Sequence, residues 1–578
     1  MRARGQFDYY LSMQHSHPTH SHPVAFALLA AVLLPLGWSL WGAVAAGLDA
    51  AGWTALAHAP HTAAALGTSV WTGVASTLLA TAATAWILAA TVGQLHSTAQ
   101  STRLTRLLSP LLAVPHAAFA IGLLALLAPS GWLLRLFSPW ATGLTAPPPW
   151  PTTQDPWGLG LIAVLVCKEI PFLLWASLAH LQRPDVAQRL QQELRLAHTL
   201  GYSAAAAWWR VGWPQLLPRL AAPLLAVLAY GLTVVDVALL VGPGTPPTLA
   251  VLAWQWLQDA DPAMNAQGVA AAWLLAAVLA LCAALTWALL HGTTWRKRWT
   301  RGAAKHAGRA QTVGRPTALA WLVAVYGAVM LALLLGSVIG PWPFPQLWPD
   351  ALTWAAWQGV ARSSDTLWTT VWLALASSGA ALLWAVAWLE WAPARWQLRA
   401  RPVLMLPLVL PAVLWVVGLH RLSLAWGLDT TGTGLWLAHT LAVLPYVLIA
   451  LQGPYQGFDP RLRHVSASLG HRHAVFLLRV KWPLLRSALA ASVAIGFAVS
   501  VAQYLPTLYV GAGRFATVTT EAVNLAAGGQ RSLTAAFAWL QWLLPVLVFA
   551  LAAAWAQPRR FVQTAQGIGH NAASTGPT

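Results

Sequence analysis

Long apolar runs recur along the whole of this 578-residue chain. Many extend for about 20 residues, enough for a helix to cross a hydrocarbon core about 30 Å thick. Hydrophobic residues make up 58% of the chain and charged residues only 8%, whereas soluble domains carry about 25% charged residues. A transmembrane β-barrel would instead show shorter segments of alternating polarity. The sequence therefore predicts an all-α polytopic membrane protein.

We predict about twelve transmembrane helices. Their expected ranges are 24–46, 66–92, 107–128, 157–180, 214–240, 267–291, 317–340, 366–390, 403–421, 434–452, 484–505 and 533–555. Lys and Arg concentrate in cytoplasmic loops of membrane proteins. The segment 295–315 holds seven Lys and Arg and no acid. Applied to all the loops, this rule places both termini in the cytoplasm.

A repeated loop indicates that the chain is duplicated. The first copy reads Leu200-Gly201, Arg210-Val211 and Trp213-Pro214, and the second reads Leu469-Gly470, Arg479-Val480 and Trp482-Pro483. Each residue of the first copy lies 269 positions before its counterpart. Both copies fall in predicted inner loops. We therefore predict two tandem six-helix halves, related by a pseudo-twofold axis along the membrane normal.

Polar stretches set the predicted domain boundaries. We expect a His-rich cytoplasmic tail (1–23), a first transmembrane domain (24–291), a basic cytoplasmic linker (292–316), a second transmembrane domain (317–555) and a cytoplasmic tail (556–578). None of these segments is long and polar enough for a soluble domain. The chain also lacks a phosphate-binding loop of the form G-x4-G-K-[ST]. Any ATPase would therefore be a separate chain.

The first repeated loop has the pattern of an amphipathic helix. Pro184 suits a first helical turn, and Gly201 suits a helix end because it readily adopts positive φ. Between them, apolar residues recur at helical spacing: Val186, Leu190, Leu194 and Ala197. A single copy would be interpreted as an ordinary interfacial helix. The second copy favours a docking module that serves a soluble partner.

These loops resemble the cytoplasmic loop of permease subunits from binding-protein-dependent ABC importers. That loop reads E-A-A, three residues, glycine, nine residues, then I-x-L-P. Its second half matches Gly201 with Val211 and Pro214, and Gly470 with Val480 and Pro483. The chain departs from the pattern in its first half, where 195–197 reads RLA and 464–466 reads HVS. Tryptophan also replaces the leucine before the proline.

The resemblance covers nearly the whole chain, because fused double permeases occur among iron(III)- and thiamine-type importers. Residues 501–508 and 511–515 also resemble a Ynj-type group of fused permeases. The resemblance implies a type I importer fold in a bacterial cytoplasmic (inner) membrane, surrounded by lipid. It further implies two ABC ATPase subunits at the loops, an external solute-binding protein and a small-molecule solute. The chain itself would be no enzyme and would bind no cofactor, since the ATPases would hold ATP and Mg²⁺.

Three charged residues fall well inside predicted spans, away from their cytoplasmic ends, where an ion at the bilayer centre costs at least ~2.5–3.5 kcal/mol. They are Lys168, Glu169 and Asp236. One interpretation is a structural Lys168–Asp236 ion pair between helices. The other is that Glu169 or Asp236 lines the solute pathway, with Gln503 as the counterpart of Asp236 in the second half. The second interpretation favours a cationic or polar solute.

Other functions fit the sequence less well. A twelve-span secondary transporter is the main alternative, but residues 96–106 lack the acid that its inner-loop signature needs. A membrane-embedded transferase would want paired carboxylates near basic residues. Nucleic-acid binding is not expected, because the basic residues are spread over every inner loop. Both cysteines, Cys167 and Cys282, lie in predicted spans, and no metal site is predicted.

Overall fold

The computed structural model describes residues 21–92, 104, 107–108, 110–181, 183–292, 317–429 and 431–556. Regular structure in these residues is helical, apart from one isolated bridge between Ile339 and Leu352. Ten of their helices are long and apolar enough to cross a membrane, or up to twelve if each of two bent pairs is one span. The all-α polytopic prediction is confirmed. The predicted tails lie almost wholly outside the described residues, as does the linker beyond Gly292.

The first half of the chain folds into long spanning helices joined by shorter ones. In order they are α2 (Ser21–Gly47), α3 (Ala50–His58), α4 (Thr62–Val92), α6 (His116–Leu127), α7 (Trp132–Phe137), α8 (Leu159–Leu181), α9 (Pro184–Thr199), α10 (Ala204–Ala207), α11 (Trp213–Leu216), α12 (Ala221–Thr233), α13 (Asp236–Val241), α14 (Leu249–Leu257) and α15 (Pro262–His291).

The second half repeats this order with small changes. Its helices are α17 (Thr317–Gly336), α18 (Ala355–Arg362), α19 (Ser364–Trp391), α20 (Ala394–Leu404), α21 (Leu406–Val409), α22 (Ala412–Ala425), α23 (Thr433–Gln456), α24 (Arg461–Ser468), α25 (His473–Phe476), α26 (Trp482–Leu484), α27 (Arg486–Val501), α28 (Leu505–Gly511), α29 (Val518–Ala527) and α30 (Arg531–Ala556).

The contacts between helices are repeated in the two halves, as is the order of the helices along the sequence. In the first half α4 contacts α8 and α12, and α14 contacts α15; in the second half α19 contacts α23 and α27, and α29 contacts α30. The residues that precede α14 and α29, Thr248 and Thr517, are themselves 269 positions apart. The duplicated loop is therefore one part of a duplicated helical unit.

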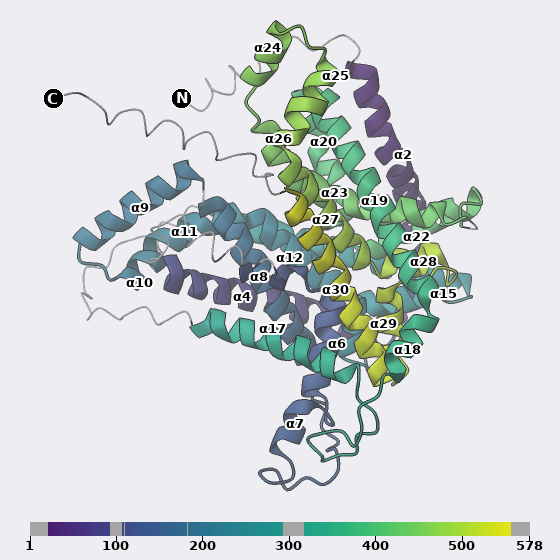
Figure 1. Cartoon of the computed structure of the whole chain (residues 1–578). Coiled ribbons are helices and arrows are strands. Elements are labelled where there is room, and N and C mark those ends of the chain that lie inside the picture. The colour runs from purple at the N-terminus through teal and green to yellow at the C-terminus, as the bar shows by residue number, and fades with distance from the viewer. Residues whose placement is uncertain are drawn as a thin grey trace, which may run out of the picture.

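The two halves exchange their first helices. The first helix of the described chain, α2, packs against α22 in the second half, while α17 packs against α6 in the first half (Figure 1). The α2–α22 crossing is tight: a Cβ atom at Gly418 would overlap the backbone of Ser39, and the Ser39 hydroxyl donates to the carbonyl of Trp415. This exchange ties the halves together along their length.

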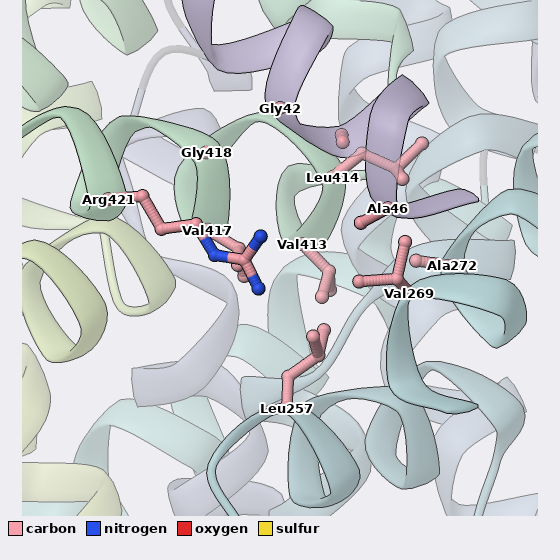
Figure 2. Close-up of a pocket in the computed structure, with 11 residues that line it drawn as sticks. Gly42, Ala46, Leu257, Val269, Ala272, Val413, Leu414, Val417, Gly418 and Arg421 are labelled. Atoms are coloured by element: carbon pink, nitrogen blue, oxygen red, sulfur yellow. The ribbon is translucent and has the colours of Figure 1, made fainter. Parts of the chain in front are cut away.

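A small, mostly apolar pocket lies beside this crossing. Figure 2 shows α2 and α22 meeting α14 and α15 there, with Gly42 and Ala46 facing Val413 and Val269. Arg421 is the one charged residue among those that line it.

Two predicted spans are wrong as straight helices. Between α21 and α22 the chain turns by 95°, inside the predicted span 403–421. Proline disfavours a helical conformation in the residue before it, and Leu410, which precedes Pro411, is extended. The predicted span 484–505 likewise begins at a 74° bend between α26 and α27.

A third predicted span, 214–240, is interrupted. Helix α12 ends at Thr233 and α13 begins at Asp236. The second half is interrupted at the equivalent place, between α27 and α28. Hydrophobicity along the chain gave no sign of either interruption, because the residues at both breaks are themselves mostly apolar.

The α2–α22 contact predicts the effect of adding one methyl group. Gly418→Ala should separate the two helices and lower the stability of the purified protein by about 1–3 kcal/mol, the usual cost of overpacking. The matched control is Gly42→Ala on α2, where a Cβ atom would meet nothing within 4 Å. Thermal denaturation followed by gel filtration measures both variants. Equal stability of the two variants would contradict this account of the crossing.

Candidate functional site

Both repeated loops fold in the same way, and we call residues 184–216 docking segment 1 and residues 461–484 docking segment 2. In each, a helix ends at a glycine with positive φ, 85° at Gly201 and 77° at Gly470. The two segments, carried by α9 and α24, lie well apart on the molecule (Figure 1). The shared fold explains why glycine recurs at the same place in both loops.

The turn after each helix is the same hydrogen-bonded motif. In docking segment 1 the amide of Gly201 donates to the carbonyl of His198 at 3.0 Å, and that of Tyr202 donates to Ala197 at 3.1 Å. In docking segment 2 the corresponding pairs are Gly470 to Ala467 at 2.9 Å and His471 to Ser466 at 3.1 Å. This is a Schellman motif, whose left-handed position glycine fills without strain.

The number of residues from glycine to proline is the same in both loops, and this equal spacing also has a structural cause. A π-helical turn spans Trp208–Gly212 in docking segment 1 and Leu477–Lys481 in docking segment 2. Pro214 and Pro483 follow these turns and lack the N–H that would bond the carbonyl four residues earlier. The carbonyls concerned belong to Arg210 and Arg479, which lie inside the two π turns. After the glycine turn, the chain thereby stays helical from α10 into α11 and from α25 into α26.

A pair of exposed apolar side chains occurs at matching positions of the two segments. Leu196 and Leu200 are 62% and 76% exposed, and Val465 and Leu469 are 55% and 69% exposed. Members of each pair are four residues apart, so they lie on one side of the helix. The adjoining side of α9 packs inward, with Leu190 and Ala197 buried and Val186 and Leu194 half-buried. Each segment thus presents a small apolar face to whatever binds there.

Docking segment 1 is held to the bundle by neutral and charged hydrogen bonds. The Glu193 carboxylate accepts from the Gln215 amide and pairs with Arg189 at 3.0 Å. The indole of Trp208 donates to the carbonyl of Ala85 in α4 at 3.1 Å. These contacts join the docking helix both to α11 and to a spanning helix. Trp213 and Pro214 are buried at this junction.

Docking segment 2 is held by a buried carboxylate, Glu390, at the end of α19. Glu390 pairs with Lys481 at 2.6 Å and with His473 at 3.0 Å, and the Tyr455 hydroxyl donates to it at 2.7 Å. The Lys481 ammonium also lies 3.9 Å from the centre of the Tyr455 ring. The Trp482 indole donates to the Tyr455 hydroxyl at 3.4 Å. We call these residues the Glu390 cluster.

Sequence reasoning missed the Glu390 cluster. Glu390 is the one charged residue in the predicted span 366–390, and a lone acid in an apolar span usually marks a buried partner. That signal is present in the sequence. The partners of Glu390 carry no such signal in the sequence, because they come from three other elements of the second half.

The predicted Lys168–Asp236 ion pair is wrong. The Lys168 ammonium donates instead to the backbone carbonyls of Leu111 and Val114. Those carbonyls lie just before α6, where the helical ladder is interrupted ahead of Pro115. Among the described residues, no basic side chain lies within 4.0 Å of the Asp236 carboxylate. Lysine serves here as a donor to unpaired backbone oxygens.

Glu169 and Asp236 belong to a group of polar side chains from several helices. Glu169 pairs with His116 at 3.3 Å, and the His116 ring lies 4.5 Å from the Tyr230 ring, centre to centre. Asp236 interacts electrostatically with His116 and with Tyr230. Two tyrosines of the second half also interact electrostatically with these acids, Tyr446 with Glu169 and Tyr504 with Asp236. We call these six residues the central polar cluster.

The last predicted pathway residue, Gln503, lies next to this cluster in sequence. It lies in the break between α27 and α28, whereas Asp236 is the first residue of α13, directly after the break that follows α12. Its backbone carbonyl accepts from the Thr507 hydroxyl at 2.9 Å. Within the described part of the chain, its side chain makes no hydrogen bond to the central polar cluster. The neighbouring Tyr504 takes the position nearest to Asp236.

The described residues contain no group of three or more His, Cys, Asp and Glu arranged to hold a metal ion. The two cysteines, Cys167 and Cys282, are free thiols.

Comparison with known proteins finds similar membrane transport proteins. The chain is 38% identical over 453 residues to the inner membrane ABC transporter permease protein YnjC of Escherichia coli (strain K12), which covers 77% of this chain and 79% of that relative. It is 27% identical over 209 residues to the molybdenum transport system permease protein ModB of Mycobacterium tuberculosis, covering 34% of this chain and 76% of ModB. No family model matches the chain.

A third relative aligns with this chain over a smaller share of the relative's own length. The thiamine transport system permease protein ThiP of Brucella suis biovar 1 is 27% identical over 225 residues, covering 36% of this chain and 39% of ThiP. The three relatives bear out the resemblance drawn from the repeated loops.

The Glu390 cluster predicts that removing Glu390 alone destabilises the protein more than removing Glu390 together with Lys481. Glu390→Gln should leave the Lys481 ammonium unpaired and destabilise the protein by about 3–5 kcal/mol. Glu390→Gln combined with Lys481→Met should recover most of that loss, because no buried charge is then left alone. Thermal denaturation of the purified protein measures both.

The matched control is Asp365→Asn, an exposed acid at the other end of the same helix. Its effect should stay within about 0.5 kcal/mol, as for most surface changes. If the double variant is no more stable than Glu390→Gln alone, the ion pair is not what holds docking segment 2.

Proposed function

The chain belongs to the permease proteins of ABC transporters, and on that premise we propose that it forms the solute pathway of an importer. Two separate ATPase subunits would drive it, one at each docking segment. The observation that carries the proposal is the matched apolar pair on each segment, Leu196 with Leu200 and Val465 with Leu469. Two equal faces in one chain suit two equal partners.

Each docking segment is connected in a way that would transmit a movement of the ATPase to the spanning helices. Docking segment 1 runs through its π turn directly into α11 and α12, and docking segment 2 runs into α26 and α27. Glu193 and the Glu390 cluster tie the segments to neighbouring helices. A displacement imposed by a closing ATPase would therefore move the spanning helices. Movement of the two halves against each other gives alternating access.

The pathway would run between the halves, past the helix breaks. Backbone without helical bonds is tolerated at membrane depth only where protein covers it or water reaches it. The breaks after α12 and after α27 occur at equivalent places, and the central polar cluster lies beside them. This position favours Glu169 and Asp236 as pathway residues.

The remaining parts of the proposal follow from family and charge. Solute would arrive on an external binding protein, and the partner ATPases would hold ATP and Mg²⁺, so this chain would bind no cofactor and catalyse no reaction. The distribution of Lys and Arg supports an inner-membrane orientation with both termini in the cytoplasm. The boundaries 24–291 and 317–555 stay predictions for the two transmembrane domains.

The docking proposal predicts that a charge on either apolar face weakens ATPase binding. Leu200→Glu and Leu469→Glu should each fold normally, because both side chains are exposed. Burying a leucine contributes about 1.5–3 kcal/mol, so each change should lower affinity for the ATPase about tenfold or more. Co-purification of the ATPase, identified by mass spectrometry and ATP hydrolysis, measures the effect.

The matched control is Leu352→Glu, a leucine that is 72% exposed and lies outside both docking segments. It should retain the ATPase fully. In proteoliposomes, uptake should require ATP and the ATPases. Full ATPase retention by both docking variants would contradict the docking assignment. Solute uptake by the chain alone, driven by a proton or sodium gradient, would favour a secondary transporter instead.

A further inference from the structure

We propose that the central polar cluster binds an organic cation, a solute that carries a protonated amine or a quaternary ammonium group. The proposal rests on the proposed function, because it names the class of solute for that same pathway. It depends on three features of the cluster: its charge, its aromatic rings and its position between the halves.

The charge of the cluster is incomplete without a ligand. It contains two carboxylates, Glu169 and Asp236, and Glu169 is paired with His116, which is cationic only when protonated. The Asp236 carboxylate accepts backbone hydrogen bonds from its own amide and from that of Val237, but no basic side chain lies within 4.0 Å of it among the described residues. Lys168 interacts with Glu169 at longer range, but its ammonium is occupied by the carbonyls of Leu111 and Val114.

A carboxylate away from bulk water needs a cation or several hydrogen-bond donors to offset its lost hydration. Asp236 is half-buried, so part of its surface is accessible to a small molecule in the pathway. A ligand ammonium would supply the missing charge. An oxyanion would instead have to approach two carboxylates, and like charges in a poorly solvated site repel strongly.

The aromatic rings of the cluster fit the same ligand. Tyr230, Tyr446 and Tyr504 come from α12, from α23 and from the residue before α28. Tyr446 is 37% exposed although its neighbours Pro445 and Val447 are buried, so protein does not fully cover its side chain. Ammonium groups bind over the faces of aromatic rings, most strongly where water is scarce. Carboxylates together with several tyrosines therefore select a cation over a neutral solute.

The cluster is also divided between the halves. Both carboxylates and His116 come from the first half, whereas Tyr446 and Tyr504 come from the second. In the repeat, Glu169 corresponds to Val443, so the second half has no equivalent acid. The site is complete only when the two halves meet. Movement of the halves apart would remove the tyrosines from a bound cation and weaken its binding.

The test measures charge selection inside the pathway and can be carried out whatever the solute is. Cys167 and Cys282 are replaced by alanine, and Tyr446→Cys places a single thiol within the cluster, in place of one of its three tyrosine rings, in the full-length chain. Two probes of similar size are compared: a methanethiosulfonate with a trimethylammonium group and one with a sulfonate group. Each rate is divided by the rate of the same probe with free cysteine.

We expect the cationic probe to react at least about tenfold faster, because two carboxylates attract it in a site of low dielectric. Asp236→Asn and Glu169→Gln should each reduce that ratio, and Asp236→Glu should restore it. Asp365→Asn, the exposed acid on α19, should leave the ratio unchanged. When the single thiol is placed instead at Leu200→Cys in docking segment 1, the ratio of the two probe rates should be the same with and without Asp236→Asn.

Equal rates for the two probes would overturn the cation site, as would faster reaction of the sulfonate. A cationic preference that survives both Asp236→Asn and Glu169→Gln would overturn it as well. ATPase co-purification is measured on the same preparations, so failure of the docking proposal is scored separately. Cation selectivity that persists without ATPase binding supports the site.

Discussion

A bilayer offers no water to unpaired backbone groups, and the arrangement of this protein follows from that constraint. Where a helix is interrupted, the structure supplies another partner for the backbone. The carbonyls ahead of α6 receive the Lys168 ammonium. At the break after α27, the Gln503 carbonyl receives the Thr507 hydroxyl, and the Val501 carbonyl receives that of Thr519. At these interruptions, polar side chains take the place of the missing backbone donors.

The sequence predicted the class of fold and the docking segments because both depend on local signals. The length of each apolar segment is read directly from the sequence. A glycine that ends a helix is recognised from its own backbone preference. The repeat indicated that Gly201 and Gly470 share a role, and both have positive φ. The π turns ahead of Pro214 and Pro483 could have been inferred from the lost proline donor.

The helix breaks, the partners of Lys168 and the Glu390 cluster depend on contacts between distant segments. Hydrophobicity along a chain does not say which side of a helix faces a neighbour, so Lys168 and Asp236 looked like a pair. The exchange of α2 and α17 between halves has no local signature either, since both helices are almost uniformly apolar. The two docking segments, nearly identical in pattern, are also supported differently: one by an amide and a carboxylate, the other by a buried carboxylate with two basic partners.

The exchange of first helices has a consequence for how the protein is made. Helix α2 ends at Gly47, and its partner α22 begins at Ala412, so the ribosome adds more than 360 residues between them. At ordinary synthesis rates this interval is on the order of 20 to 70 s. During that time α2 has its first-half partner α15, whose Trp273 indole donates to the Ala43 carbonyl, but the part of its surface that packs on α22 is exposed to lipid or to the insertion machinery. The first half of the chain is therefore an assembly intermediate, completed only after much of the second half has been synthesised.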